Sequence, residues 1–308
     1  MATKKIKGTG VAIVTPFNED KSIDFQSLGN LIEYLIKGGI DFLVVLGTTG
    51  ETATLTTDER NQVLDFVIEV NNGRLPIVAG FGGNNTQAVI NSIKARGDFS
   101  RIDAILSVAP YYNKPNQRGL YEHFIAIAEV SPIPIILYNV PGRTKSNINA
   151  ETTLRLAEHE NIIAIKEASG NFIQIMEIIR NKPDDFTVLS GDDAITLPLI
   201  SIGLEGVISV VAMAMPEKMS KMVAQVLEAN YAQAMKLHYD LLPLTNAIFE
   251  DGNPAGIKAA LSIKGLIKNE LRLPLVPVST EVYTKIKKIL THLLDHDHRD
   301  TWHRDLGL

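Results

Sequence analysis

Short apolar runs alternate along this chain with longer stretches in which apolar residues recur at helical spacing. The apolar runs predict eight buried strands, at residues 11–15, 42–46, 76–79, 102–108, 134–138, 162–166, 186–190 and 206–210. Amphipathic helical patterns lie between them, near residues 25–37, 57–70, 86–96, 117–129, 150–158, 171–181 and 194–202. Strands that alternate with helices and lack a polar face predict a parallel sheet buried on both sides.

Eight such strands are the number that closes an α/β fold into a (β/α)8 TIM barrel. Periodicity does not distinguish closure from an open, doubly wound sheet, so that alternative stays open. The rest of the chain contains no convincing strand and predicts helices near 217–228, 231–249, 255–268 and 280–294. We therefore expect a barrel over residues 1–228, and a C-terminal all-helical domain with a polar tail over residues 229–308.

Composition excludes several classes of function. The chain has 308 residues, of which 45% are hydrophobic and 21% charged, as is typical of soluble globular proteins. The net charge of -5 provides no basic surface for nucleic acid, and the lack of cysteine excludes disulfides, thiol catalysis and iron–sulfur ligation. The basic N-terminus lacks the apolar core of a signal peptide, and no run approaches the roughly 18 apolar residues of a membrane span. We expect a cytoplasmic protein.

Lys166 ends one of the apolar runs and is the first candidate for chemistry. Burying an amine in an apolar barrel disfavours its charged form, and the neutral amine is the nucleophile that forms Schiff bases. A lone lysine at such a position more often lies at a strand end with its ammonium in water. The residues expected near it must therefore decide between a solvated lysine and a catalytic one. Strand alternation places Ala164 and Ile162 on the same face as Lys166. Glu167 then falls on the opposite face, and we expect it not to pair with the amine.

Other polar residues follow the strands, and chemistry in a barrel gathers at the C-terminal strand ends. Tyr138 is a candidate proton shuttle, although a tyrosine there is more often a core edge whose hydroxyl finds a partner. Arg143 is a candidate carboxylate clamp, because its guanidinium binds carboxylates bidentately, although most arginines are simply exposed. The turn at residues 47–51, GTTGE, offers hydroxyls and backbone N–H groups to a carboxylate or phosphate; it equally fits a glycine turn with capping threonines.

Four of the seven histidines lie near the C-terminus: His292, His296, His298 and His303. A metal site needs ligands that converge on a scaffold. Because this segment is polar and terminal, we expect a solvated end rather than a metal centre.

Three segments together resemble the dihydrodipicolinate synthases, which belong with N-acetylneuraminate lyase to the pyruvate-dependent class I aldolases. They are residues 47–51 (GTTGE), 138–144 (YNVPGRT) and 166–171 (KEASGN), and the resemblance runs from about Gly8 to Leu294. It implies a (β/α)8 barrel with a C-terminal helical domain and a homotetramer. It also implies condensation of pyruvate with aspartate semialdehyde in diaminopimelate and lysine biosynthesis, with neither a metal nor an organic cofactor.

The resemblance assigns the catalytic roles residue by residue. Lys166 resembles the Schiff-base lysine. Tyr138, Thr49 and Tyr112 resemble the proton-relay triad, in which Tyr112 reaches into a neighbouring subunit's site. Ala109 is a local departure, since threonine is common at that position.

The resemblance also assigns substrate contacts. Thr48 and Thr49 resemble the binders of the pyruvate carboxylate, and Arg143 the clamp for the aldehyde's carboxylate. Gly191 and Ile208 match positions whose backbone lines the site. Arg143 favours the synthase over the sialic-acid lyase. Another aldolase, acting on a sialic acid or a 2-keto-3-deoxy sugar acid, stays an alternative, as does a non-catalytic barrel that only binds.

Many members of the family that this chain resembles are inhibited by lysine, which binds in a pocket at an interface. The matching positions here are Thr52, Ala53, Thr57, Arg60, Asn84, Ala88 and Tyr111. Lysine-sensitive members usually have histidine at the position of Arg60 and glutamate at that of Ala88. Ala88 removes a carboxylate that would pair with the ligand's ammonium, and Arg60 adds a like charge. We expect a degenerate pocket and poor inhibition by lysine.

Overall fold

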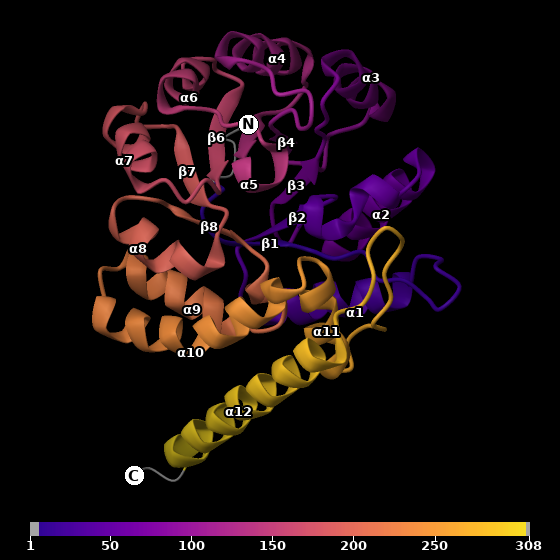
Figure 1. Cartoon of the computed structure of the whole chain (residues 1–308), viewed down its shortest axis with the longest axis vertical. Coiled ribbons are helices and arrows are strands. Elements are labelled where there is room, and N and C mark those ends of the chain that lie inside the picture. Colours follow the sequence, from indigo (N-terminus) through magenta and orange to yellow (C-terminus); the bar gives the residue numbers. More distant parts are fainter. Residues whose placement is uncertain (1–5, 306–308) are drawn as a thin grey trace.

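The computed structural model describes residues 6–305, with side chains described to residue 295. Eight parallel strands form a barrel in sequence order (Figure 1): β1 (Gly8–Ala12), β2 (Phe42–Val45), β3 (Ile77–Gly80), β4 (Ala104–Val108), β5 (Ile135–Asn139), β6 (Ile162–Glu167), β7 (Thr187–Ser190) and β8 (Gly206–Ser209). Because β8 pairs with β1, the sheet is closed. The predicted barrel is confirmed, and the open doubly wound sheet is wrong.

Helices surround the barrel and connect its strands: α1 (Phe25–Lys37), α2 (Thr57–Asn71), α3 (Thr86–Arg96), α4 (Gln117–Val130), α5 (Pro141–Thr144), α6 (Ala150–Ala157), α7 (Phe172–Asn181) and α8 (Thr196–Ser201). Six of them start at a side chain that accepts a hydrogen bond from a free N–H of the first turn. These capping residues are Asp24, Thr56, Asn85, Asn116, Asn149 and Asn171. The short α5 was not predicted.

Four helices follow the barrel in the described part of the chain: α9 (Pro216–Leu227), α10 (Tyr231–Glu250), α11 (Ala255–Ile263) and α12 (Thr280–Asp305). They lie along one side of the barrel, and α12 extends away from it (Figure 1). The predicted helix at 255–268 ran too far, because the chain turns at Gly265 with φ of +71°. Whether residue 228 is a domain boundary stays a prediction.

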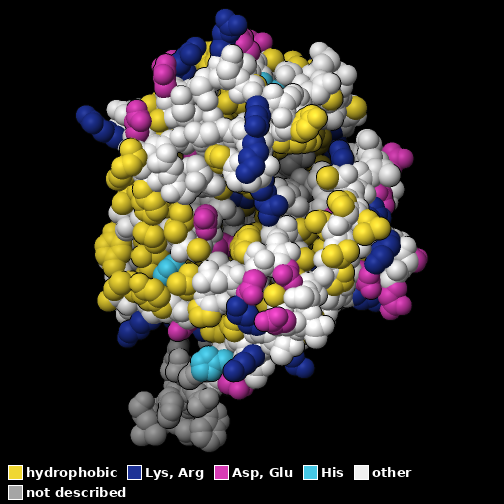
Figure 2. All heavy atoms as spheres, in the orientation of Figure 1, with side chains coloured by type: hydrophobic (Ala, Val, Ile, Leu, Met, Phe, Trp, Pro, Cys, Tyr) yellow, Lys and Arg dark blue, Asp and Glu magenta, His cyan; other side chains and the backbone are white. Residues whose placement is uncertain are grey.

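The histidine-rich end of the chain lies at the limit of the described residues. The backbone of α12 is helical through Asp305. The side chains of His296, His298 and His303 lie outside the described residues, so the expected solvated end is untested there. Among the described residues, no helix has both the length and the apolar composition needed to cross a bilayer. Figure 2 shows acidic and basic side chains interspersed over one face, which is hollowed near its centre.

The alternating strand residues divide the core into a barrel interior and a layer beneath the helices. The interior is tight beside β1, where a Cβ on Gly10 would lie 2.1 Å from the Phe42 ring. Glycine at that position therefore leaves room for the ring. It also explains why the predicted strand began at Val11, since Gly8 and Gly10 carry no apolar side chain to signal a strand.

Strands β5 and β6 set the register of the candidate site. Their pairing shifts between Ile135 and Ile136 and then places Tyr138 beside Lys166. Because of that shift, Ile162 packs in the outer layer, whereas Ile163 packs against the barrel interior. The expectation that Ile162 shares a face with Lys166 was therefore wrong, although Ala164 does face the interior.

Candidate active site

Lys166 and Tyr138 meet at the C-terminal end of the barrel. Lys166 is 6% exposed, and its Nζ lies 4.3 Å from the centroid of the Tyr138 ring. Gly191, after β7, permits this arrangement, since a Cβ there would lie 3.0 Å from Lys166 Cε and 2.8 Å from Ala168 Cβ. A larger residue at position 191 would push the lysine chain aside.

These residues line a cavity of about 500 Å³. That volume falls within the range of small-molecule sites, and part of the lining is apolar. The apolar part includes Ala12, Leu106, Val140, Ala168 and Val210. The polar lining includes Thr48, Thr49, Tyr138, Arg143, Lys166, Asp192, Asn246, Glu250 and Asn253.

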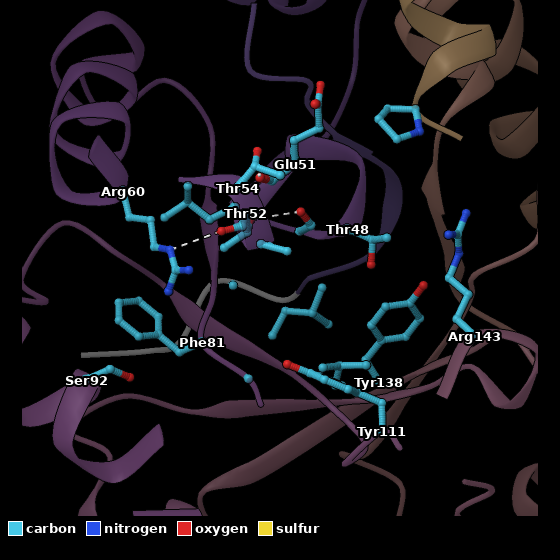
Figure 3. A pocket seen from close by; sticks show the side chains of 18 of the residues that line it. Thr48, Glu51, Thr52, Thr54, Arg60, Phe81, Ser92, Tyr111, Tyr138 and Arg143 are labelled. Carbon is cyan, nitrogen blue, oxygen red and sulfur yellow. Dashed lines mark hydrogen bonds between the residues drawn. The ribbon is translucent and has the colours of Figure 1, made fainter. Parts of the chain in front are cut away.

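The GTTGE turn places Thr49 at this cavity on a short 3₁₀ helix (Thr48–Gly50). Thr49 is 3% exposed, and its Oγ1 accepts a hydrogen bond of 2.9 Å from Asn253 Nδ2. Thr48 is exposed on the same turn. In Figure 3 the Tyr138 hydroxyl points towards the space between Thr48 and Arg143. Hydroxyl groups, an arginine and a buried amine therefore border one space.

Arg143 lies on α5, directly after β5, and its Nη2 donates to the backbone oxygen of Asn253 at 3.3 Å. Asn253 comes from the loop between α10 and α11, which folds back over the barrel. Sequence reasoning missed Asn253, because nothing in its local pattern indicates that it reaches a turn 204 positions earlier.

Behind Lys166, a buried amide network holds the end of β6. Glu167 accepts hydrogen bonds from Asn139 Nδ2 (3.0 Å), Ser169 N (2.7 Å) and Gln174 Nε2 (3.3 Å). Burial raises the pKa of the Glu167 carboxyl above its usual range, although these donors act in the opposite direction. Each of these contacts is with a residue other than Lys166, in keeping with the opposite-face expectation.

A second cavity of about 560 Å³ adjoins the first, and Tyr138 and Arg143 line both. Its lining includes five of the seven residues expected at an effector pocket, namely Thr52, Ala53, Thr57, Arg60 and Tyr111. Asn84 and Ala88 are not part of that lining, but Asn84 Nδ2 donates to the backbone oxygen of Tyr111 at 3.1 Å. Arg60 Nε donates to the backbone oxygen of Thr52 at 3.2 Å (Figure 3).

Two of the residues predicted to act in catalysis or substrate contact lie elsewhere. Tyr112 is 87% exposed, has φ of +73° and lines neither cavity, so one chain alone does not bring it to Thr49 and Tyr138. Ile208 is buried inside the barrel and does not line either cavity.

The fold and the site together define a class of protein: a (β/α)8 barrel with a buried lysine amine opposite a tyrosine at the C-terminal strand ends. Comparison with known proteins narrows this class. Residues 5–293 match the dihydrodipicolinate synthetase family, and the chain belongs to that family.

Named relatives agree with this assignment. The chain is 51% identical to the 4-hydroxy-tetrahydrodipicolinate synthase of Parabacteroides distasonis over 95% of this chain and 99% of that protein. A crystal structure of the dihydrodipicolinate synthase of Acinetobacter baumannii with pyruvate matches with a TM-score of 0.91 and 41% identity, over 94% of this chain and 99% of that one. The synthase of Cyanidioschyzon merolae with lysine bound matches with a TM-score of 0.89 and 37% identity, over 93% and 98%.

Proposed function

We propose that this chain is a 4-hydroxy-tetrahydrodipicolinate synthase. It condenses pyruvate with aspartate semialdehyde through a Schiff base on Lys166, in the first committed step of diaminopimelate and lysine biosynthesis. The observation that carries the proposal is the buried Lys166 amine against Tyr138, in a cavity that also holds Thr49 and Arg143. Relatives that are about 50% identical in sequence bear this name.

The first half of the reaction makes the nucleophile. The neutral Lys166 amine attacks the ketone carbon of pyruvate, and loss of water gives an imine. Thr48 and Thr49 hold the pyruvate carboxylate through the hydroxyls and N–H groups of their turn. The protonated imine then accepts the electron pair left when the methyl group loses a proton, which gives an enamine.

The second half joins the two substrates. The enamine carbon attacks the aldehyde carbon, and the aldehyde oxygen takes up a proton that Tyr138 delivers. The amino group of the condensed chain then attacks the imine carbon, closes the ring and releases the Lys166 amine. Arg143 holds the carboxylate of the semialdehyde through a charge-assisted pair.

Substrate tests separate this reaction from the aldolase alternatives. The enzyme is expected to consume pyruvate when given aspartate semialdehyde, and not when given N-acetylmannosamine or a simple sugar aldehyde. Pyruvate consumption is followed by a coupled assay. Faster turnover with a sugar aldehyde would favour a sialic-acid or 2-keto-3-deoxy sugar acid aldolase. Binding of pyruvate without turnover of any aldehyde would favour the non-catalytic barrel.

Replacing Arg143 with Ala is expected to raise the Michaelis constant for the semialdehyde and to spare imine formation. Loss of a hydrogen bond to a charged group costs about 1.5–3 kcal/mol, or roughly 10- to 100-fold in that constant. Arg180→Ala, at an exposed position on α7, is the matched control. An unchanged aldehyde constant in Arg143→Ala would instead indicate a substrate without that carboxylate.

We also propose that the enzyme is a cytoplasmic homotetramer in which Tyr112 completes the relay of a neighbouring subunit. The exposure of the Tyr112 ring supports this arrangement. Tyr112→Phe is expected to slow turnover by about 10²- to 10⁴-fold while pyruvate binding changes little. Hybrids of Tyr112→Phe and Lys166→Ala subunits, purified with two affinity tags, are expected to regain activity. Hybrids as inactive as both parents would count against a shared site.

Free lysine is expected to inhibit this enzyme poorly or not at all. Arg60 lines the adjoining cavity and would repel a cationic ligand by about 1 kcal/mol or more, and Ala88 offers no carboxylate to an ammonium group. A steady-state assay with lysine titrated into the millimolar range tests this. The paired change Arg60→His with Ala88→Glu is expected to increase sensitivity. Strong inhibition of the parent at submillimolar lysine would show the expectation to be wrong.

A further inference from the structure

The loop before α11 places one amide on the wall of the catalytic cavity. We propose that Asn253 is a positioning residue for the proton relay. It holds the Thr49 hydroxyl as an acceptor, so that the Thr49 hydrogen remains free for Tyr138 or for the substrate. This inference rests on the proposed function and adds to the relay a residue from the C-terminal helical segment.

The first observation is the hydrogen bond between the side chains of Asn253 and Thr49. Asn253 Nδ2 and Thr49 Oγ1 are 2.9 Å apart, and the two residues are 8% and 3% exposed. A threonine hydroxyl has one hydrogen and can accept as well as donate, whereas an amide N–H can only donate. Thr49 therefore accepts here, and its own hydrogen is not used in this bond.

The orientation of the amide decides what Thr49 can do. Asn253 Oδ1 is buried without a partner in the part of the chain that the structure describes. An amide turned over would place Oδ1 against Thr49 and would take its hydrogen. The orientation with Nδ2 towards Thr49 leaves that hydrogen available.

The second observation is that Asn253 contacts both substrate sides of the cavity. Its side chain holds Thr49, and its backbone oxygen accepts a 3.3 Å hydrogen bond from Arg143 Nη2. Thr49 serves pyruvate in the proposed reaction, and Arg143 serves the semialdehyde. A single residue thus sets the spacing between the relay and the carboxylate clamp.

The third observation is that a buried ion pair anchors this loop to the turn that carries Thr49. Lys258, on α11, pairs with Glu51 at the end of the turn, and both side chains are fully buried. Glu51 Oε2 also accepts a 3.1 Å hydrogen bond from Arg272 N. The position of Asn253 relative to Thr49 is therefore fixed by contacts outside the cavity.

Asn253→Asp tests the direction of the bond without a change in size. A carboxylate can only accept, so it would take the Thr49 hydrogen, and kcat is expected to fall by about 10²-fold or more. Asn253→Ala only removes the hydrogen bond to Thr49, and a smaller loss of roughly tenfold in kcat is expected. A residue that merely fills space would give the opposite order, with the cavity-forming alanine the worse variant.

The pH profile provides a readout that a structural role would not move. At low pH the carboxyl introduced by Asn253→Asp is protonated and can donate to Thr49 as the amide does, so the ratio of variant to parent kcat is expected to rise towards acid pH. The titratable and charged groups lining the same cavity are Tyr138, Arg143, Lys166, Asp192 and Glu250. Asn253 also borders the adjoining cavity, which Glu51, Arg60, Arg96 and Tyr111 line. All of these groups are present in both proteins, and the control below accounts for the shift in their pKa values that any new carboxylate in the cavity causes. Asn246→Asp places a carboxyl in the same cavity from α10 and is expected to show no such acid recovery.

Trapping of the pyruvate imine on Lys166 with borohydride distinguishes failure of the proposed function from failure of the inference about Asn253. No trapping in the parent protein would defeat the proposed function itself. With trapping intact, the inference is overturned if kcat of Asn253→Asp lies within twofold of the parent, or if its ratio is flat with pH. Acid recovery in Asn246→Asp would also overturn it. If Asn253→Asp does not fold, Asn253→Ala decides, and a kcat within twofold of the parent overturns the inference.

Discussion

Replacing Lys166 with Ala is expected to reduce turnover of pyruvate and aspartate semialdehyde to the background rate while the barrel stays folded. Lys166 is the one lysine among the described residues that line the catalytic cavity, so no nearby amine can take its place. Its side chain borders that cavity, and alanine there removes a costly buried amine rather than a packed apolar group. The thermal unfolding midpoint should therefore stay close to that of the parent.

The control for this variant is Lys94→Ala, at an exposed position on α3. Both proteins are assayed after the same purification, with circular dichroism to verify the fold. Appreciable turnover by purified Lys166→Ala would exclude a covalent mechanism at this residue.

The largest expected effect on stability comes from Lys258. Its ammonium pairs with Glu51 in a fully buried contact, donates to the backbone oxygen of Glu270 at 2.8 Å and lies 4.1 Å from the centroid of the Phe17 ring. Burial lowers the pKa of Lys258 to about 8, against the opposing attraction of Glu51, so the amine is still charged at neutral pH. Lys258→Met would leave the Glu51 carboxylate buried without its counter-charge.

We expect Lys258→Met to lower the free energy of unfolding by about 3–5 kcal/mol, the usual cost of removing one partner from a buried ion pair. That is a large part of the 5–15 kcal/mol typical of a folded domain. Glu51→Gln with Lys258→Met removes both charges and is expected to regain most of the loss in urea unfolding. A free energy of unfolding of Lys258→Met within about 1 kcal/mol of the parent value would contradict this account. So would a double variant that is less stable than Lys258→Met.

Local sequence signals were enough to predict most elements of the fold. The bounds of α1 and α3 match those predicted, because each helix has a capping residue at its start, Asp24 or Asn85, and glycine after its end. The start of β1 was missed, since Gly8 and Gly10 signal no strand, although Gly10 makes room for the ring of Phe42. A local pattern predicts an element from its side chains. It therefore misses positions such as Gly10, where the fold requires a residue without one.

The candidate site was predictable only in part. The meeting of Lys166 and Tyr138 follows from two neighbouring strands that end in polar residues, once the barrel is assumed. Asn253 and Lys258 reach the GTTGE turn only because the C-terminal helices dock on that side of the barrel. No pattern around either residue carries that information, so a sequence alone does not reveal them.

The most direct test of the central claim is to incubate the enzyme with pyruvate, reduce with borohydride and map the labelled peptide by mass spectrometry. The account predicts a single reduced pyruvate adduct, on the peptide that contains Lys166, and no adduct when pyruvate is omitted. An adduct on a different lysine, or no adduct at all from an enzyme that turns over, would contradict the account.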